Sequence, residues 1–450
     1  MGPIKQHEER MNKIVTVSLL FGAQLFSFMI RYALSIVAPT LMKQYHLSPQ
    51  TMGYVLSGWN WSYTAGLPIL GPVVDRFGAW IVLGLGSVVW GASTIALPLA
   101  SAAGSLFLLR MLFGFGHSML ISAGASAIAR RFHVKERTRA VAIAFAGNQV
   151  GLAVSATVAA FILARAGWQA VFYCIGGASL LFTLAWFGFY PDKRIGGRSA
   201  GTASREPGRG TREKKEAYSD SAHETNRRRI SWLSLFRYRS TWGIAFGQMG
   251  YLYAYFFFVS WLPGYLVLER KMTLLQSGIA SALPFWAGML GTLGGGWLGE
   301  YLIQRGVTTA VSRKSIIGVG LMASTVLVVV AAYVERSWLA VALLTLCVGF
   351  LRLATGSVNS LPIDLAPPAA VASLASIQSF FGNVGGLLAP IVTGRIVSVT
   401  GSFAISLVVA GGMALFGAIS YLFIMGDLEK DPIEPTTPRV AARVAPSSSA

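Results

Sequence analysis

Long apolar segments follow one another along nearly the whole chain, with short polar segments between them. Each run is close to the roughly 20 residues that an α-helix needs to cross the hydrocarbon core of a membrane. The pattern predicts an all-α integral membrane protein with twelve membrane-spanning helices, at 14–38, 51–72, 80–100, 105–129, 139–164, 168–190, 239–266, 276–299, 315–334, 338–361, 371–396 and 402–425. An even number of spans places both termini on the same side of the membrane.

Three polar segments interrupt this pattern. Residues 1–13 form a polar N-terminus, residues 191–238 are rich in Gly, Ser, Arg and Glu, and residues 427–450 are rich in Pro and Ser. Segments without an apolar period cannot bury a core, so we predict a solvated linker at 191–238 and a disordered tail at 427–450. The linker separates two six-helix halves, 14–190 and 239–426.

Composition and charge support a membrane protein. Of the 450 residues, 54% are hydrophobic and 12% are charged, whereas about 25% of a soluble domain is charged. The net charge of +19 does not indicate nucleic-acid binding, because the basic residues alternate with the spans and collect on one side. By the positive-inside rule this side is cytoplasmic and holds both termini; examples are Lys5, Arg10, Lys13, Arg130, Arg131, Lys135, Arg137 and Arg139.

The two halves contain related short motifs. A Gly-x-x-x-acid motif ends the second span, from Gly71 to Asp75, and the eighth span, from Gly296 to Glu300. A Gly-Asn-x-x-Gly motif lies in the fifth span at 147–151 and in the eleventh at 382–386. The matching positions indicate a duplicated six-helix unit with pseudo-symmetric halves. Transporters built from such repeats bind substrate between the repeats, near the middle of the bilayer.

These features resemble the major facilitator superfamily, and within it the anion:cation symporter family. The resemblance rests on the twelve spans, on Gly71-x-x-x-Asp75-Arg76-x-Gly78, and on the segments 256–266, 295–300, 312–314 and 382–390. It implies a carrier for organic anions, such as sugar acids or aromatic acids, that works by alternating access. It also implies a gating role for the motif residues Gly71, Asp75, Arg76, Gly78 and Glu300.

Four ionisable side chains interrupt the apolar runs. These are Arg31, Arg110, Arg352 and His117, whereas all 18 acidic residues fall in loops, tails or helix ends. A buried arginine costs several kcal/mol unless a water-filled cavity or a counter-ion balances its charge. We therefore expect the substrate to supply the missing negative charge, bound through the planar two-pronged guanidinium group. The alternative for each arginine is a brace to backbone carbonyl groups.

Neutral side chains complete the candidate substrate site. We predict that amide and aromatic residues line the site together with the three arginines. These residues are Phe28, Tyr63, Asn148, Gln149, Tyr251, Tyr255 and Asn383. Tyr63 and Gln149 match positions that line the cavity of the family. For each polar residue, a hydrogen bond between helices is an equally good interpretation.

The coupling mechanism departs from the pattern of the resembled family. Proton-coupled members commonly carry an Asp-Arg pair in the first span and a Glu seven residues after the arginine of the fourth. This chain has Ile30-Arg31 and, after Arg110, His117. Imidazole titrates near physiological pH and offers a replacement proton carrier, but neighbouring arginines oppose its protonation. Proton symport through His117, uniport and anion exchange all remain open, with obligatory proton coupling not favoured.

The sequence thus predicts a monomeric carrier in the inner membrane, with no cofactor and no metal. Three other classes are alternatives: an exporter of amphipathic drugs, a membrane-embedded enzyme and a sensor on the same fold. A cationic drug would be repelled by Arg31 and Arg110, and His117 has no acid or second histidine at metal-ligand spacing. The identity of the anion is left open.

Overall fold

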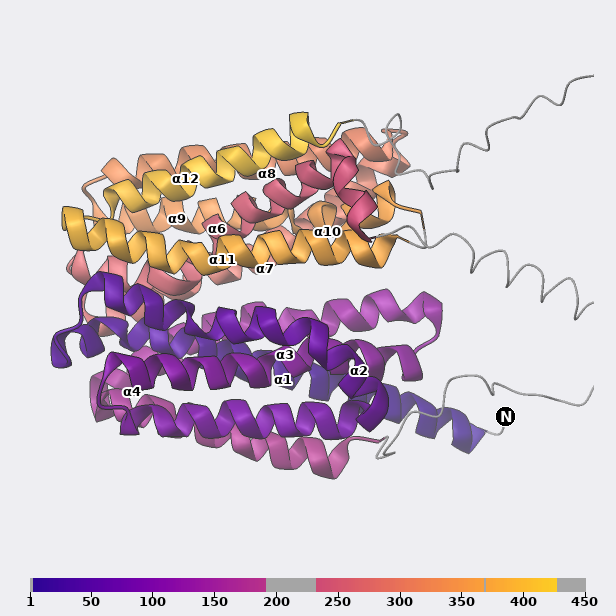
Figure 1. Cartoon of the computed structure of the whole chain (residues 1–450), viewed down its shortest axis with the longest axis horizontal. Coiled ribbons are helices and arrows are strands. Elements are labelled where there is room, and N and C mark those ends of the chain that lie inside the picture. The colour runs from indigo at the N-terminus through magenta and orange to yellow at the C-terminus, as the bar shows by residue number, and fades with distance from the viewer. Residues whose placement is uncertain (1–2, 192–231, 368–369, 427–450) are drawn as a thin grey trace, which may run out of the picture.

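The computed structural model describes residues 3–191, 232–367 and 370–426, and the elements found there are all helical (Figure 1). The predicted tail and nearly all of the predicted linker lie outside the described residues. The first half contains α1 (Pro3–Gln44), α2 (Pro49–Ala96), η1 (Leu97–Leu99), α3 (Ala103–Arg131) and α4 (Val134–Phe189). The second half contains η2 (Trp232–Arg237), α6 (Arg239–Leu268), α7 (Leu274–Gln304), α8 (Thr309–Tyr333), α9 (Ser337–Leu353), α10 (Thr355–Leu365), α11 (Val371–Thr400), α12 (Ala404–Ile419) and the π-helical η3 (Ser420–Ile424).

Two of the long elements each contain two spans. α2 bends at Gly78 and α4 bends at Gly167, and both glycines have a φ of 81°. Glycine adopts this left-handed conformation without the steric penalty of a Cβ atom, so the chain reverses within a single residue. Conversely, α9 and α10 form one span with a break at Ala354, and η3 extends α12. With α1, α3, α6, α7, α8 and α11 these make the twelve spans of the predicted fold.

Several helices extend beyond the predicted spans. α1 begins at Pro3, inside the predicted polar N-terminus, and reaches Gln44, six residues past the predicted end. Similarly, α4 begins at Val134, five residues early. Apolar patterning identifies only the part of a helix that faces hydrocarbon, because backbone hydrogen bonding continues through polar residues at either end.

The spans form two bundles that lie side by side (Figure 1). In the first half α1 packs on α4 and α2 on α3, and in the second half α6 packs on α11, α7 on α9 and α8 on α12. Three helix pairs join the halves: α2 with α11, α4 with α7 and α1 with α6. Most of the candidate site residues, including Arg31, Gln149 and Tyr255, lie on these joining helices, so the interface between the bundles positions most of the site. Arg110 and His117 lie on α3, and Arg352 lies in the last turn of α9.

We name the two ends of the bundle by their residues. The proximal end contains the start of α1, Gly78 and the turns at 131–134, 304–309 and 365–371, and the distal end contains Gly167 and the turns at 44–49, 96–103, 268–274, 333–337 and 400–404. The helices run between these ends in alternating directions.

Near the distal end, the helix backbones of the two halves are in contact with each other. A Cβ atom added to Gly53 of α2 would lie 2.4 Å from the carbonyl oxygen of Pro390, and one added to Gly394 of α11 would lie 2.4 Å from the carbonyl oxygen of Pro49. At Gly278, α7 approaches α4 in the same way. Small residues allow this close approach between membrane helices. The hydrogen bond from Arg395 to Gln50 (3.0 Å) joins the halves at the same end.

Candidate anion-binding site

Arg31 of α1 and Arg110 of α3 meet in the interior of the first half. Arg31 is 4% exposed and Arg110 is 1% exposed. The Arg110 Nη2 donates to the Arg31 carbonyl oxygen at 3.5 Å. Gly58 of α2 makes room for this pair, since an added Cβ atom there would lie 3.1 Å from the Arg110 Cβ. The structure therefore brings the two predicted arginines into one cluster.

Aromatic rings from both halves surround the guanidinium group of Arg31. Its Cζ lies 3.7 Å from the ring centroid of Trp59, 4.3 Å from that of Phe256 and 5.1 Å from that of Phe28. Trp59 and Phe256 also stack on each other across the interface, with centroids 5.7 Å apart. Rings over the face of a guanidinium leave its N–H edge available for a carboxylate. Sequence reasoning included Phe28 but missed Trp59 and Phe256.

Much of the donor capacity of these arginines has no partner. Nε and Nη2 of Arg31, and Nε and Nη1 of Arg110, are buried without a hydrogen-bond partner. Among the described residues, no carboxylate forms an ion pair with either side chain. Buried charges in proteins are normally paired and fully hydrogen-bonded. The cluster thus has the chemistry of a site that an anion completes.

His117 lies beside the same cluster. The Ser27 hydroxyl hydrogen-bonds to the His117 Nδ1. The ring centroid of His117 lies 5.2 Å from that of Tyr63 and 5.8 Å from that of Phe113, and it also contacts the rings of Phe28 and Trp59. The seven-residue spacing predicts that Arg110 and His117 share a face of α3, and the structure agrees.

A second cationic cluster comes from the other half. Arg352 lies near the end of α9, just before the break at Ala354, and its Nη1 donates to the Tyr251 hydroxyl at 3.0 Å. That hydroxyl also bonds to the Thr355 hydroxyl at 2.8 Å. The Arg352 Cζ lies 4.8 Å from the Tyr255 ring, and its Nε is buried without a partner. The structure thereby groups Arg352 with both predicted tyrosines of α6.

Gln149 connects the first half to the second cationic cluster. Its Oε1 accepts a hydrogen bond from the Tyr255 hydroxyl at 3.0 Å, which joins α4 of the first half to α6 of the second. Its Nε2 is buried without a partner. A Cβ atom added to Gly288 would lie 3.3 Å from this Nε2 and 3.1 Å from the Arg352 Cγ. Gln149 therefore offers a free amide donor beside Arg352 and Tyr255.

The other two predicted amides have different roles. The Oδ1 of Asn148 is buried without a partner, so this atom is free to accept a hydrogen bond. The Asn383 side-chain amide donates to the Ser379 carbonyl of the same helix at 2.9 Å, and the Asn383 backbone carbonyl accepts from the Asn60 side chain of α2 at 2.8 Å. The contact between the halves at this position is thus made by the Asn383 backbone, and the ligand contact of its side chain stays a prediction.

The motif residues predicted to gate the carrier lie at the proximal end. Gly78 forms the kink in α2, and Arg76 is exposed with its Cζ 5.4 Å from the Phe77 ring. Glu300 is exposed near the end of α7. The side chain of Asp75 and the surroundings of Gly71 lie outside the described residues. The gating role of all five residues, including these two, stays a prediction.

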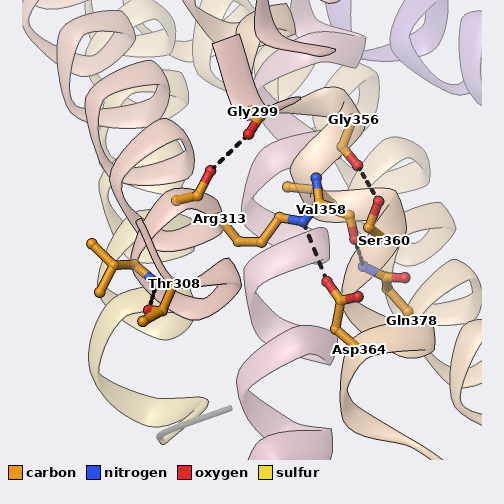
Figure 2. A network of polar contacts seen from close by, with 10 residues as sticks. Gly299, Thr308, Arg313, Gly356, Val358, Ser360, Asp364 and Gln378 are labelled. Atoms are coloured by element: carbon orange, nitrogen blue, oxygen red, sulfur yellow. Dashed lines mark hydrogen bonds and ion pairs between the residues drawn. The ribbon is translucent and has the colours of Figure 1, made fainter. Parts of the chain in front are cut away.

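At the proximal end of the second half the structure reveals an ion pair that sequence reasoning missed. Arg313 at the start of α8 pairs with Asp364 of α10 at 3.3 Å (Figure 2). Hydrogen bonds surround it: the Ser312 hydroxyl donates to the Gly299 carbonyl at 3.3 Å, and the Gln378 amide donates to the Val358 carbonyl at 3.0 Å. These contacts join α7, α8, α10 and α11. The sequence does not reveal this pair, because Asp364 lies 51 residues after Arg313 and the two meet only through packing of the helices.

Two six-helix bundles that enclose a polar, positively charged interior site define a membrane transporter rather than an enzyme. The chain belongs to the Major Facilitator Superfamily, whose family model matches residues 20–312. The fold agrees with a solved structure of a bacterial homologue of the human lysosomal transporter Spinster, inward-facing and unoccupied, with a TM-score of 0.74 and 17% identity. That comparison covers 94% of this chain and 99% of the other.

Curated relatives match along nearly the full chain. The probable L-galactonate transporter of Escherichia coli is 29% identical, over 95% of this chain and 93% of that protein. The hexuronate transporter of Bacillus subtilis is 28% identical, over 91% of this chain and 94% of that protein. The probable sulfoacetate transporter of Cupriavidus necator is 28% identical, over 92% of this chain and 94% of that protein.

Proposed function

We propose that this protein carries a small organic anion across the cytoplasmic membrane by alternating access between its two halves. The observation that carries the proposal is the Arg31–Arg110 cluster, with four buried donor nitrogens free of partners and no carboxylate of the described residues paired to them. An anion with two oxygens matches the forked geometry of a guanidinium group. The substrates in the names of the relatives, galactonate, hexuronate and sulfoacetate, are all small organic acids.

The proposed site extends from this cluster to the second half. Arg31 and Arg110 bind the anionic group, Phe28 and Tyr63 line its surroundings, and Asn148 and Gln149 bond to neutral oxygens. Tyr251, Tyr255 and Arg352 form the opposite wall, while Asn383 joins helices beside it. Hydrogen-bonding amides and tyrosines favour a hydroxylated acid, and the relatives favour a sugar acid over an aromatic acid. One chain supplies all of these groups, so a monomer suffices.

The orientation follows from the basic residues. Those of 130–139 lie around the turn between α3 and α4, at the proximal end. The positive-inside rule places this end in the cytoplasm, together with both termini. The close backbone contacts lie at the distal end, so in this arrangement the site is separated from the outside by the joined halves. Motif residues Gly71, Asp75, Arg76, Gly78 and Glu300 are then placed where the cytoplasmic side opens and closes.

Transport is tested by counterflow in proteoliposomes. Vesicles loaded with unlabelled galactonate, hexuronate or an aromatic carboxylate are expected to accumulate the labelled acid transiently through the purified protein. A parallel thermal-shift screen compares carboxylates with lipophilic cations, which the arginine charges repel. Stabilisation by cations with no response to any carboxylate would support a drug exporter instead. Absence of flux for every acid, with folded protein shown by size-exclusion chromatography, would contradict the proposal.

We further propose exchange or uniport rather than obligatory proton symport. The carboxylates that carry protons in the resembled family are replaced by Ile30 and His117. Four aromatic rings and the Ser27 hydroxyl surround His117, and the nearby arginines disfavour a further positive charge.

His117→Gln keeps a neutral hydrogen-bonding side chain at this position. We expect the pH profile of uptake to be unchanged in this variant, because His117 carries no proton in the transport cycle. Uptake is measured between about pH 5.5 and pH 8, a range that spans the ordinary titration of imidazole. Loss of a pH dependence present in the wild type, or complete collapse of wild-type uptake with a protonophore, would show that proton coupling is obligatory.

A further inference from the structure

We infer that the site is built for a dianion: the Arg31–Arg110 cluster binds one acidic group and Arg352 binds a second acidic group at the other end of the same substrate. The inference rests on the proposed function and adds the substrate class. It assigns Arg352 as the residue that selects dicarboxylates over monocarboxylates. Arg352 comes from the second half, so a dianion would contact both halves of the carrier through charged bonds.

Charge balance is the first argument. Three guanidinium groups face the interior, and among the described residues none of them forms an ion pair. One carboxylate on the Arg31–Arg110 cluster would leave the Arg352 charge unbalanced. Hydroxyl groups of Tyr251 and Thr355 contact this region but carry no negative charge. A second anionic group on the substrate would pair with Arg352 and lower the excess positive charge of the three arginines from two to one.

The free donor on Arg352 is the second argument. Its Nη1 is used by Tyr251, whereas its Nε is buried and has no partner. A brace role would direct these donors to backbone carbonyl groups, as Arg270 does with the carbonyls of Val334 and Ala331. No such bond from Arg352 to a carbonyl group is found in the described part of the chain. Arg352 thus differs from the structural Arg270 and, like Arg31, has a buried donor without a partner.

Spacing is the third argument. A row of contacts connects the two clusters: the Arg31 Cζ lies 4.3 Å from the Phe256 centroid, that ring lies 5.9 Å from the Tyr255 ring, and the latter lies 4.8 Å from the Arg352 Cζ. The two guanidinium carbons are therefore at most about 15 Å apart. An extended six-carbon diacid with charged hydrogen bonds at both ends spans about 14 Å between two such carbons.

The groups between the clusters suit the middle of such a molecule. The Nε2 of Gln149 is an unpartnered donor beside Arg352, and Asn148 on the same helix offers an unpartnered Oδ1. Amide donors and acceptors bind hydroxyl groups. The aromatic rings of Tyr255 and Phe256 provide an apolar wall for C–H groups. A hydroxylated dicarboxylate of up to about six carbons is therefore within the available span, and it fits better than a fully apolar one.

The test compares two ligands that differ only at one end. Galactarate and D-galactonate share the same chain length and hydroxyl configuration, but galactarate has a carboxylate where galactonate has a primary alcohol. Their affinities are measured by isothermal titration on purified wild type and on Arg352→Gln, Arg352→Lys and Arg31→Gln. Arg305→Gln serves as the control, because Arg305 is an exposed arginine at the proximal end, away from the site.

We expect the wild type to bind galactarate at least about tenfold more tightly than galactonate. Arg352→Gln should weaken galactarate binding by about tenfold or more and change galactonate binding less than about twofold, so that the preference disappears. Arg352→Lys should keep part of the preference, and it serves as the readout if Arg352→Gln does not fold. Arg31→Gln should weaken both ligands.

Two results would overturn the inference while leaving the proposed function intact. One is equal binding of the two ligands by the wild type, and the other is an equal loss for both ligands in Arg352→Gln. If the wild type binds no acid of a broad carboxylate panel, the proposed function itself fails, and this inference fails with it.

Discussion

Arg31→Lys is expected to weaken substrate binding by about ten- to a hundredfold although the charge is retained. The guanidinium group lies against the stacked rings of Trp59 and Phe256 and has two donors without a partner. An ammonium group cannot match this planar stacking or bind a carboxylate through two parallel bonds. Each lost charged hydrogen bond contributes about 1.5–3 kcal/mol. Affinity for the acid identified by counterflow is measured by titration on purified protein.

Two further variants give this prediction its control and its contrast. Arg165→Lys makes the same chemical change at an exposed arginine that lies 4.5 Å from the Phe161 ring, and it should leave affinity unchanged. Arg110→Lys should behave like Arg31→Lys, because both arginines contribute unpartnered donors to one cluster. Near wild-type affinity in folded Arg31→Lys would exclude Arg31 from the site and leave the anion assignment to Arg110.

Gly53→Leu is expected to reduce transport by about tenfold or more by preventing the distal end from closing. Even the Cβ atom would lie 2.4 Å from the Pro390 carbonyl oxygen, which belongs to the backbone of the other half. Overpacking of this kind costs about 1–3 kcal/mol. The cost applies only to the state in which the two halves touch at this end, so it shifts the conformational equilibrium toward the state that is open distally.

The shift is measured as a distance between spin labels at the distal end. Labels at Ser101→Cys of the first half and Glu335→Cys of the second lie in exposed turns, in a background of Cys174→Ser that removes the exposed native thiol. We expect longer distances in Gly53→Leu and in Gly394→Leu. Gly104→Leu is the control, because an added Cβ atom there meets nothing within 4 Å. An unchanged distance distribution with reduced transport would refute the mechanism.

Part of the site could be predicted from the sequence because membrane insertion is nearly a one-dimensional constraint. The bilayer sets the length of each apolar run, and a charge inside such a run is unusual enough to indicate function. The three arginines, His117 and the absence of an interior acid were visible for that reason. Likewise, the seven-residue spacing of Arg110 and His117 places both on one face of a regular helix.

Rotation of each helix about its axis, and the choice of its neighbours, could not be predicted in this way. Arg31 and Arg110 are separated by 79 positions and meet only because α1 packs near α3. Trp59 and Phe256 look like ordinary apolar residues until the two halves stack them on Arg31. The sequence left two roles open for Asn383; in the structure its side-chain amide donates to the Ser379 carbonyl of its own helix, and its backbone carbonyl accepts from Asn60.

The sequence by itself determined the twelve-span fold and the class of a small organic anion as substrate, and it predicted the duplicated halves and the basic side of the membrane. The tertiary structure decided which charges share a site, which donors remain unpartnered, and that Arg352 faces the same interior from the opposite half. The hydropathy of a segment depends only on its own residues, so the membrane-spanning segments can be predicted from the sequence. Packing depends on side-chain contacts between distant segments, such as Gly53 with Pro390, and these exist only in the folded bundle.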